Sequence, residues 1–302
     1  MQAVQAPMLR PLGVGDVLDR TFTVYRSKPL LFIGLSAIWY LILVLVFIVL
    51  AVAIFAGALA AFARQSATPS PEQLAGAAAG IVGFVIVAVI VAIILISAQS
   101  AALVHAAARR YLAKEVTIGE SFRAGLSASV RLFVAGVLVF LAIVAVWAVL
   151  LIVAAIANQG IVWVVAVLAA IVASAYLACS WLVAPVVVVM EKLGPISALG
   201  RSWRLSGGNR WRIFGIQILL LILNLVLSVL IGALFGGFAA AGQLGQPGQL
   251  GITTVVQTLV NFASTIIWAP VEWIAFTVLY YDLRVRKEAF DLQLAAEALP
   301  QS

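Results

Sequence analysis

The sequence predicts an all-α integral membrane protein with six transmembrane helices. Two observations on composition support this: 65% of the 302 residues are hydrophobic, and only 10% are charged. A typical soluble domain is about 45–50% apolar and about 25% charged. The mean hydropathy of +1.20 points the same way. These values exclude a soluble globular enzyme, a disordered protein and a secreted disulfide scaffold.

Four long uncharged stretches define the spans. One bilayer crossing needs about 20 apolar residues, so Leu30–Ala63 and Gln73–Ala108 fit one helix each. The stretches Leu132–Met190 and Ile213–Val271 each run for 59 residues and fit two helices each. Turn-forming residues near their middles, at 158–160 and 242–248, mark where they divide. We therefore expect six helices, at approximately 30–58, 77–105, 132–157, 161–189, 213–238 and 253–281.

The Lys and Arg residues orient these spans. Of the 18 basic residues, 17 lie before the first span, between spans two and three, between spans four and five, or after the sixth, and only Arg64 lies on the other side. Because basic residues in short flanking segments stay in the cytoplasm, we expect both termini inside, in a bacterial cytoplasmic membrane. The net charge of +7 then reflects attraction to anionic lipid headgroups, and nucleic acid is not an expected partner.

The segments that precede spans one, three and five resemble one another. Each is a short amphipathic stretch with its apolar residues on one helical face, and Thr117 and Glu120 have capping-box spacing at the start of the second. Spans four and six also share a motif, in Trp181–Val186 and Trp268–Val271. We expect one membrane domain made of three pseudo-repeats and a cytoplasmic tail, at approximately 13–108, 117–191, 194–287 and 288–302.

Each repeat would be a cytoplasmic interfacial helix followed by a transmembrane hairpin. The interfacial helices are expected to lie on the cytoplasmic leaflet, where their arginines meet lipid phosphates. A surface that binds a protein partner is the alternative. The arginines expected to make these contacts are Arg20, Arg26, Arg123, Arg131, Arg201, Arg204, Arg212, Arg284 and Arg286.

Three parts of the chain resemble a known family. The segment Arg10–Phe22, the segment Tyr280–Leu292, and a middle region with Ala184–Glu191, Gly200–Trp203 and Arg212 are similar to bacterial six-span proteins of the glycerophosphoryl diester phosphodiesterase membrane domain family. The resemblance implies a six-span membrane module. The family takes its name from proteins in which such a module is fused to a soluble phosphodiesterase domain, whose chemistry uses two histidines and a carboxylate-held metal.

That catalytic chemistry has no counterpart in this sequence. The chain has a single histidine, His105, and no cluster of metal-ligating carboxylates. The resemblance therefore implies a membrane module with no phosphodiesterase activity, no metal and no cofactor. An intramembrane enzyme of another kind stays open.

Glu272 is the only acidic residue inside an expected span. Asp282 marks the inner end of that span, so at 1.5 Å per residue Glu272 lies about 15 Å deeper, near the midplane. Charged groups at this depth are costly and are functional candidates by default. Pro270 removes a backbone donor two residues earlier and favours a kink. Further polar residues of the last two spans complete this candidate intramembrane site: Asn224, Gln257 and Asn261. A structural carboxyl that is hydrogen-bonded across the bundle is the alternative interpretation.

These features favour a non-catalytic polytopic membrane protein, an accessory or organising module for lipid or envelope processes. The alternative is a transporter or channel that moves a small solute or ion past the midplane carboxyl, because transport folds often combine repeats with helices broken at the midplane. The three repeats share one orientation and the span interiors hold few polar residues. Both features weigh against a wide aqueous path.

Overall fold

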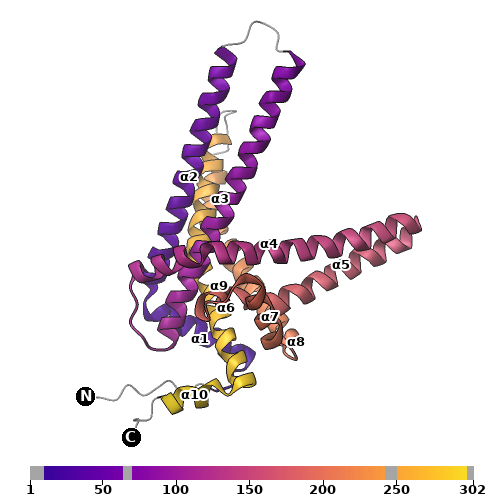
Figure 1. Cartoon of the computed structure of the whole chain (residues 1–302). Coiled ribbons are helices and arrows are strands. Elements are labelled where there is room, and N and C mark those ends of the chain that lie inside the picture. Colours follow the sequence, from indigo (N-terminus) through magenta and orange to yellow (C-terminus); the bar gives the residue numbers. More distant parts are fainter. Residues whose placement is uncertain (1–9, 64–69, 242–249, 298–302) are drawn as a thin grey trace.

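A computed structural model describes residues 10–63, 70–241 and 250–297 (Figure 1). Within these ranges all regular secondary structure is α-helical. The helices are α1 (Val14–Ser27), α2 (Pro29–Ala63), α3 (Pro71–Tyr111), α4 (Ile118–Ala157), α5 (Gly160–Trp181), α6 (Ala184–Met190), α7 (Pro195–Ser206), α8 (Arg210–Ala241), α9 (Leu250–Glu288) and α10 (Phe290–Glu297). Arg64 and the turn expected at 242–248 lie outside the described residues.

Within the described residues, six helical stretches are long and apolar enough to cross a membrane, which confirms the predicted all-helical class and the six expected spans. They are Pro29–Gly57, Ala75–Tyr111, Ile118–Ala157, Gly160–Met190, Arg210–Leu234 and Thr258–Glu288. The turn expected at 158–160 is also present, because Asn158 ends α4 in the left-handed conformation (φ 47°). Asparagine is one of the few residues that tolerate this conformation at a helix end.

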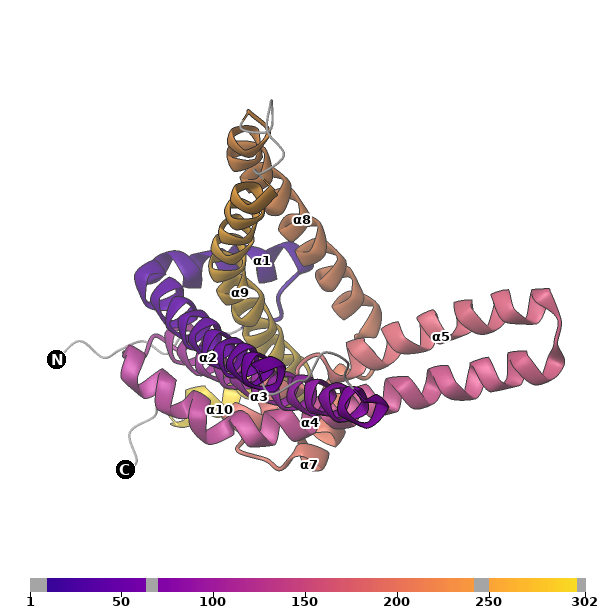
Figure 2. The same cartoon turned by 90° about the horizontal axis from the view of Figure 1, so that it is seen from above.

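The spans form three pairs that leave a common base in different directions. Figures 1 and 2 show α2 beside α3, α4 beside α5, and α8 beside α9, with the α4–α5 pair diverging from the other two. We call the distal parts of these pairs the arms. We call the shared base the hub. It consists of α1, α6, α7 and the C-terminal half of α9, together with the adjoining ends of the paired helices. Its core is built around α9 residues such as Ile274, Val278 and Leu279, which are fully buried.

The three segments that were predicted to be amphipathic take two different forms. Helices α1 and α7 are separate from the spans that follow them, whereas the segment at 118–126 is the first part of the continuous helix α4. Lys28 precedes a proline, which disfavours helical geometry at that residue, and Gly208 has a φ of +79°, which favours glycine. The second segment has no such interruption before its span. Its capping box forms as predicted, because the Thr117 hydroxyl accepts from the Glu120 amide and the Glu120 carboxylate accepts from the Thr117 amide.

The two related proline motifs also differ in structure. A proline removes one backbone donor and crowds the carbonyl four residues earlier. At Pro185 the helix is broken, since α5 ends at Trp181 and α6 begins at Ala184. Pro270 instead lies inside the continuous helix α9. Beside this second proline, the Tyr25 hydroxyl of α1 donates to the carbonyl oxygen of Ile267, at 3.4 Å.

Candidate functional site

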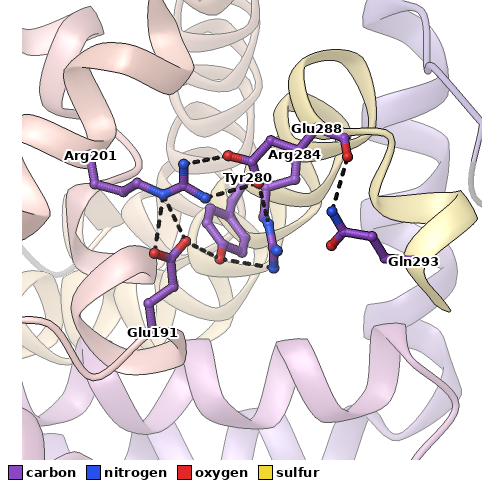
Figure 3. Close-up of polar contacts among 6 residues, drawn as sticks. All are labelled: Glu191, Arg201, Tyr280, Arg284, Glu288 and Gln293. Carbon is purple, nitrogen blue, oxygen red and sulfur yellow. Dashed lines mark hydrogen bonds and ion pairs between the residues drawn. The ribbon is translucent and has the colours of Figure 1, made fainter. Parts of the chain in front are cut away.

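One polar cluster of the hub joins α6, α7 and α9 (Figure 3). The Nε of Arg201, on α7, donates to both carboxylate oxygens of Glu191, at 3.2 and 3.1 Å. Its Nη2 donates to Glu288, at the end of α9, at 2.9 Å. The Tyr280 hydroxyl donates to Glu191 at 2.8 Å, and Arg284 Nε donates to Glu288 at 3.0 Å. We call this set the Arg201 junction.

The Arg201 junction fixes both the charge and the position of its central arginine. The hydrogen bond to Glu288, with a further contribution from Glu191, raises the pKa of Arg201 above its ordinary value, although partial burial opposes the charged form. Because the two carboxylates come from the ends of α6 and α9, the guanidinium holds three elements in one arrangement. Charge-assisted hydrogen bonds of this kind are stronger than neutral ones.

A second cluster ties the chain before α1 to the hub. The Asp282 side chain is fully buried; it is ion-paired with Arg212 of α8 and accepts from Arg286 Nε at 3.1 Å. It also accepts from the Leu12 amide at 2.7 Å. The Leu12 carbonyl oxygen in turn accepts from both arginines, at 2.6 Å each. We call this set the Asp282 junction. It satisfies a buried carboxylate with two guanidinium groups and one backbone amide.

The nine arginines that were predicted to contact lipid fall into three groups in the structure. Four of them are held in ion pairs inside the protein: Arg201, Arg212, Arg284 and Arg286. Arg20 lies over the ring of Tyr111, 5.6 Å from its centroid, and Arg131 donates to the Lys192 carbonyl at 2.8 Å. The other three are exposed: Arg26, Arg123 and Arg204. The carboxylate partners were not singled out as site residues from the sequence; the only signal was that Glu191 and Asp282 each end a span.

The candidate intramembrane residues do not gather into one compact site. Glu272 is half-buried on α9. Asn261 is exposed on the same helix, and its separation of eleven positions places it about 16 Å from Glu272 along the axis. Asn224 is partly buried on α8. The side chain of Gln257 lies outside the described residues.

One cavity lies between the helix pairs near the hub. It has a volume of about 420 Å³ and is lined by residues of α3, α4, α5, α6 and α9, among them Ser97, Ser100, Trp181, Pro185 and Trp273. Its lining is mostly apolar, and its hydroxyl groups come from α3. Among the described residues, no three His, Cys, Asp or Glu side chains gather in a way that could hold a metal ion.

Comparison with known proteins places the chain in a family. The model of the family described as "Domain of unknown function (DUF7847)" matches residues 12–282, which is most of the chain. The chain belongs to this family. No curated protein and no solved structure matches the sequence. The DUF7847 match begins and ends at Leu12 and Asp282, the two residues that hydrogen-bond in the Asp282 junction. The conformation of the hub thus joins the two ends of the DUF7847 region.

Proposed function

We propose that this protein is a non-catalytic membrane module, accessory to lipid or envelope processes, whose hub binds anionic lipid headgroups. It would lie in a bacterial cytoplasmic membrane with both termini inside, and α1 and α7 would lie at the cytoplasmic interface. The resemblance to the glycerophosphoryl diester phosphodiesterase membrane domain agrees with such a module. The alternative is that the same surface binds a protein partner instead of lipid.

The distribution of charge on the hub supports the proposal. Three of its carboxylates, those of Glu191, Asp282 and Glu288, are engaged by arginines within the protein. The cations of Arg26, Arg123 and Arg204 are instead exposed. A basic residue near an anionic leaflet contributes about 1 kcal/mol to membrane attraction. The hub therefore engages these three carboxylates internally and exposes the cations of Arg26, Arg123 and Arg204.

The proposal is tested by measuring lipid preference. The purified protein is titrated with phosphatidylglycerol and with phosphatidylcholine in nanodiscs or by native mass spectrometry, and phosphatidylglycerol is expected to bind more tightly. A variant with Arg26→Gln, Arg123→Gln and Arg204→Gln removes three exposed charges and should lose about 100-fold in this preference. The matched variant with lysine at all three positions keeps the charges and should retain it. Equal binding of the two lipids by the wild type would contradict the proposal.

The alternative of a transporter or channel keeps one specific observation in its favour. Glu272 lies in the interior of α9, two residues after Pro270. Labelling of Glu272→Cys in a Cys179→Ala background by a membrane-impermeant thiol reagent, applied from each side, tests whether water reaches this position. Labelling would favour transport. Protection from both sides in a folded protein, and a proteoliposome flux unchanged by Glu272→Gln, would remove its main support.

A further inference from the structure

Arg210 occupies a distinctive position at the start of α8. Its guanidinium carbon lies 4.6 Å from the ring centroid of Tyr176, on α5, and 4.9 Å from that of Trp203, on α7. The two rings meet edge to face, with their centroids 5.7 Å apart. The cation therefore sits in a corner formed by two aromatic rings. Aromatic faces attract cations electrostatically, so the corner stabilises the charge without using the N–H groups.

A hydrogen-bonded chain fixes the orientation of this guanidinium. Arg210 Nε donates to the Ser180 hydroxyl at 2.8 Å. That hydroxyl donates its own proton to the Tyr176 carbonyl, at 2.8 Å, and is thereby left as an acceptor for Arg210. The Ser202 hydroxyl, on α7, donates to the Ser180 carbonyl at 2.9 Å and holds α7 against α5. Three helices thus determine where Arg210 points.

Arg210 differs from Arg201 and Arg212 because it has no carboxylate partner among the described residues. Arg201 and Arg212 are neutralised by carboxylates. Throughout the described ranges, Arg210 takes part in no ion pair, and its two Nη groups make no hydrogen bond. A guanidinium with both Nη groups available presents two parallel donors, which match two oxygens of a phosphate group. Arg210 is therefore oriented by the protein, carries an uncompensated charge, and keeps donors for an anion.

The aromatic side chains around Arg210 are of the kind expected at the level of lipid headgroups. Tyr176 and Trp203 are 47% and 37% exposed, and Trp211, the next residue in the chain, is 87% exposed. Tyrosine and tryptophan are enriched where the hydrocarbon meets the headgroups. Tyr176 lies within the last two turns of α5, and Arg210 is the first residue of the span Arg210–Leu234. An anion reaching Arg210 here would meet rings that accommodate the glycerol and upper acyl regions of a lipid.

We propose that Arg210, Tyr176 and Trp203 form a binding site for the phosphate group of an anionic phospholipid. The two Nη groups of Arg210 donate to two phosphate oxygens, and the exposed parts of the two rings pack against the glycerol backbone. This inference deepens the proposed function and rests on its assignment of the hub to an anionic leaflet. It adds a specific site to the diffuse attraction of exposed charges, and it assigns that site to a residue outside the set expected from the sequence.

The test compares two arginines that differ in surroundings but carry the same charge. Phosphatidylglycerol affinity is measured by native mass spectrometry for the wild type, Arg210→Gln and Arg204→Gln. Loss of the charged hydrogen bonds in Arg210→Gln should weaken binding about 10- to 100-fold. Arg204→Gln removes one exposed charge worth about 1 kcal/mol and should weaken it by only about 5-fold. Equal effects of the two substitutions would overturn the proposal.

Two conservative variants separate a specific site from a simple charge effect. Arg210→Lys keeps the charge but lacks the planar donor pair, so it should lose most of the affinity; full retention would contradict the two-point contact. Ser180→Ala leaves the charge in place and removes the bond that orients it, and several-fold weaker binding is expected. These variants carry the same test if Arg210→Gln does not fold, and wild-type affinity in both would overturn the proposal.

Further controls identify the source of the phosphate. They also show whether a negative result contradicts the Arg210 site alone or the proposed function as well. Millimolar inorganic phosphate should leave phosphatidylglycerol bound; displacement would show that a free anion, and not a lipid, is the ligand. A wild-type protein that binds phosphatidylglycerol and phosphatidylcholine equally would refute the proposed function and the site together. A clear preference that persists in Arg210→Gln would refute the site alone.

Discussion

The two halves of α9 lie in different surroundings although they belong to one helix. Leu259, near its beginning, is 62% exposed, whereas Leu279, twenty residues later, is fully buried. The first half belongs to an arm and the second to the hub. Helix α9 is contacted by α1, α6 and α7, and its second half carries Glu288 of the Arg201 junction and Asp282 of the Asp282 junction.

This contrast shows that the two regions have different requirements. In a bilayer, lipid tails are as apolar as leucine, so helices gain little from hiding apolar side chains from lipid. An arm therefore needs only sufficient length and hydropathy. The hub, which we propose to lie at the cytoplasmic interface, depends on packing and on paired charges. Substitutions in the hub should consequently be costly where equivalent ones in an arm are tolerated.

The largest effect is expected from breaking the Asp282 junction. Asp282→Asn leaves Arg212 and Arg286 without their carboxylate, and removing one partner of a buried pair costs about 3–5 kcal/mol. The free energy of unfolding, measured by denaturant titration in mild detergent, should fall by this amount. Asp19→Asn, at an exposed position of α1, makes the same charge change and should be nearly neutral. Similar losses in both variants would show that overall charge, and not the junction, matters.

A second test uses the two leucines of α9. Leu279→Ala should leave a cavity in the hub and lower the free energy of unfolding by about 2–5 kcal/mol. The side chain of Leu259 faces outward from an arm, so Leu259→Ala should lower the free energy of unfolding by less than about 1 kcal/mol. Thermal unfolding of both variants in the same detergent measures the difference. Comparable losses would mean that the arms are packed as tightly as the hub.

A third test concerns the close approach of α4 to α3. A Cβ added at Gly125 would lie 2.5 Å from the Ala98 carbonyl oxygen and 3.0 Å from the Ala102 Cβ. Gly125→Ala should therefore destabilise the protein by about 1–3 kcal/mol. At Gly136, farther along α4, an added Cβ meets nothing within 4 Å, so Gly136→Ala should stabilise the helix by about 0.5–1 kcal/mol. The melting temperature should therefore fall in Gly125→Ala and rise in Gly136→Ala, relative to the wild type.

The smallest effect is expected at the surface loop after α3. The hydrogen bond with Lys28 lowers the pKa of Glu115 below its ordinary value of 4.5. A lowered folded pKa stabilises the protein above the unfolded value, and this contribution is lost as the pH falls through the folded pKa. Because Glu115 is exposed, the effect should be small and should vanish in high salt. Melting temperatures of the wild type and Glu115→Gln, compared at pH 7 and pH 3, should converge at the lower pH.

The sequence predicted the spans better than the hub, for a physical reason. Hydropathy and helix length are local properties, so the six spans and the turn at Asn158 could be located directly. The Asp282 junction joins residues that are 270 positions apart, and no local pattern encodes that contact. Likewise, Pro185 and Pro270 sit in similar motifs, yet only one breaks its helix, because the outcome depends on neighbouring elements. Nothing in the local sequence distinguishes Arg210 from the other basic residues, because its surroundings are supplied by α5 and α7.

The continuity of α4 has a mechanical consequence. A helix of 40 residues is about 60 Å long and behaves as a stiff rod. Its first turns pack in the hub, and its far end reaches the tip of an arm (Figure 1). A tilt of about 5° at the hub would therefore displace the tip by about 5 Å. Neither α1 nor α7 is continuous with its span, so α4 alone among the three could act as a lever that carries a displacement at one membrane face to the other.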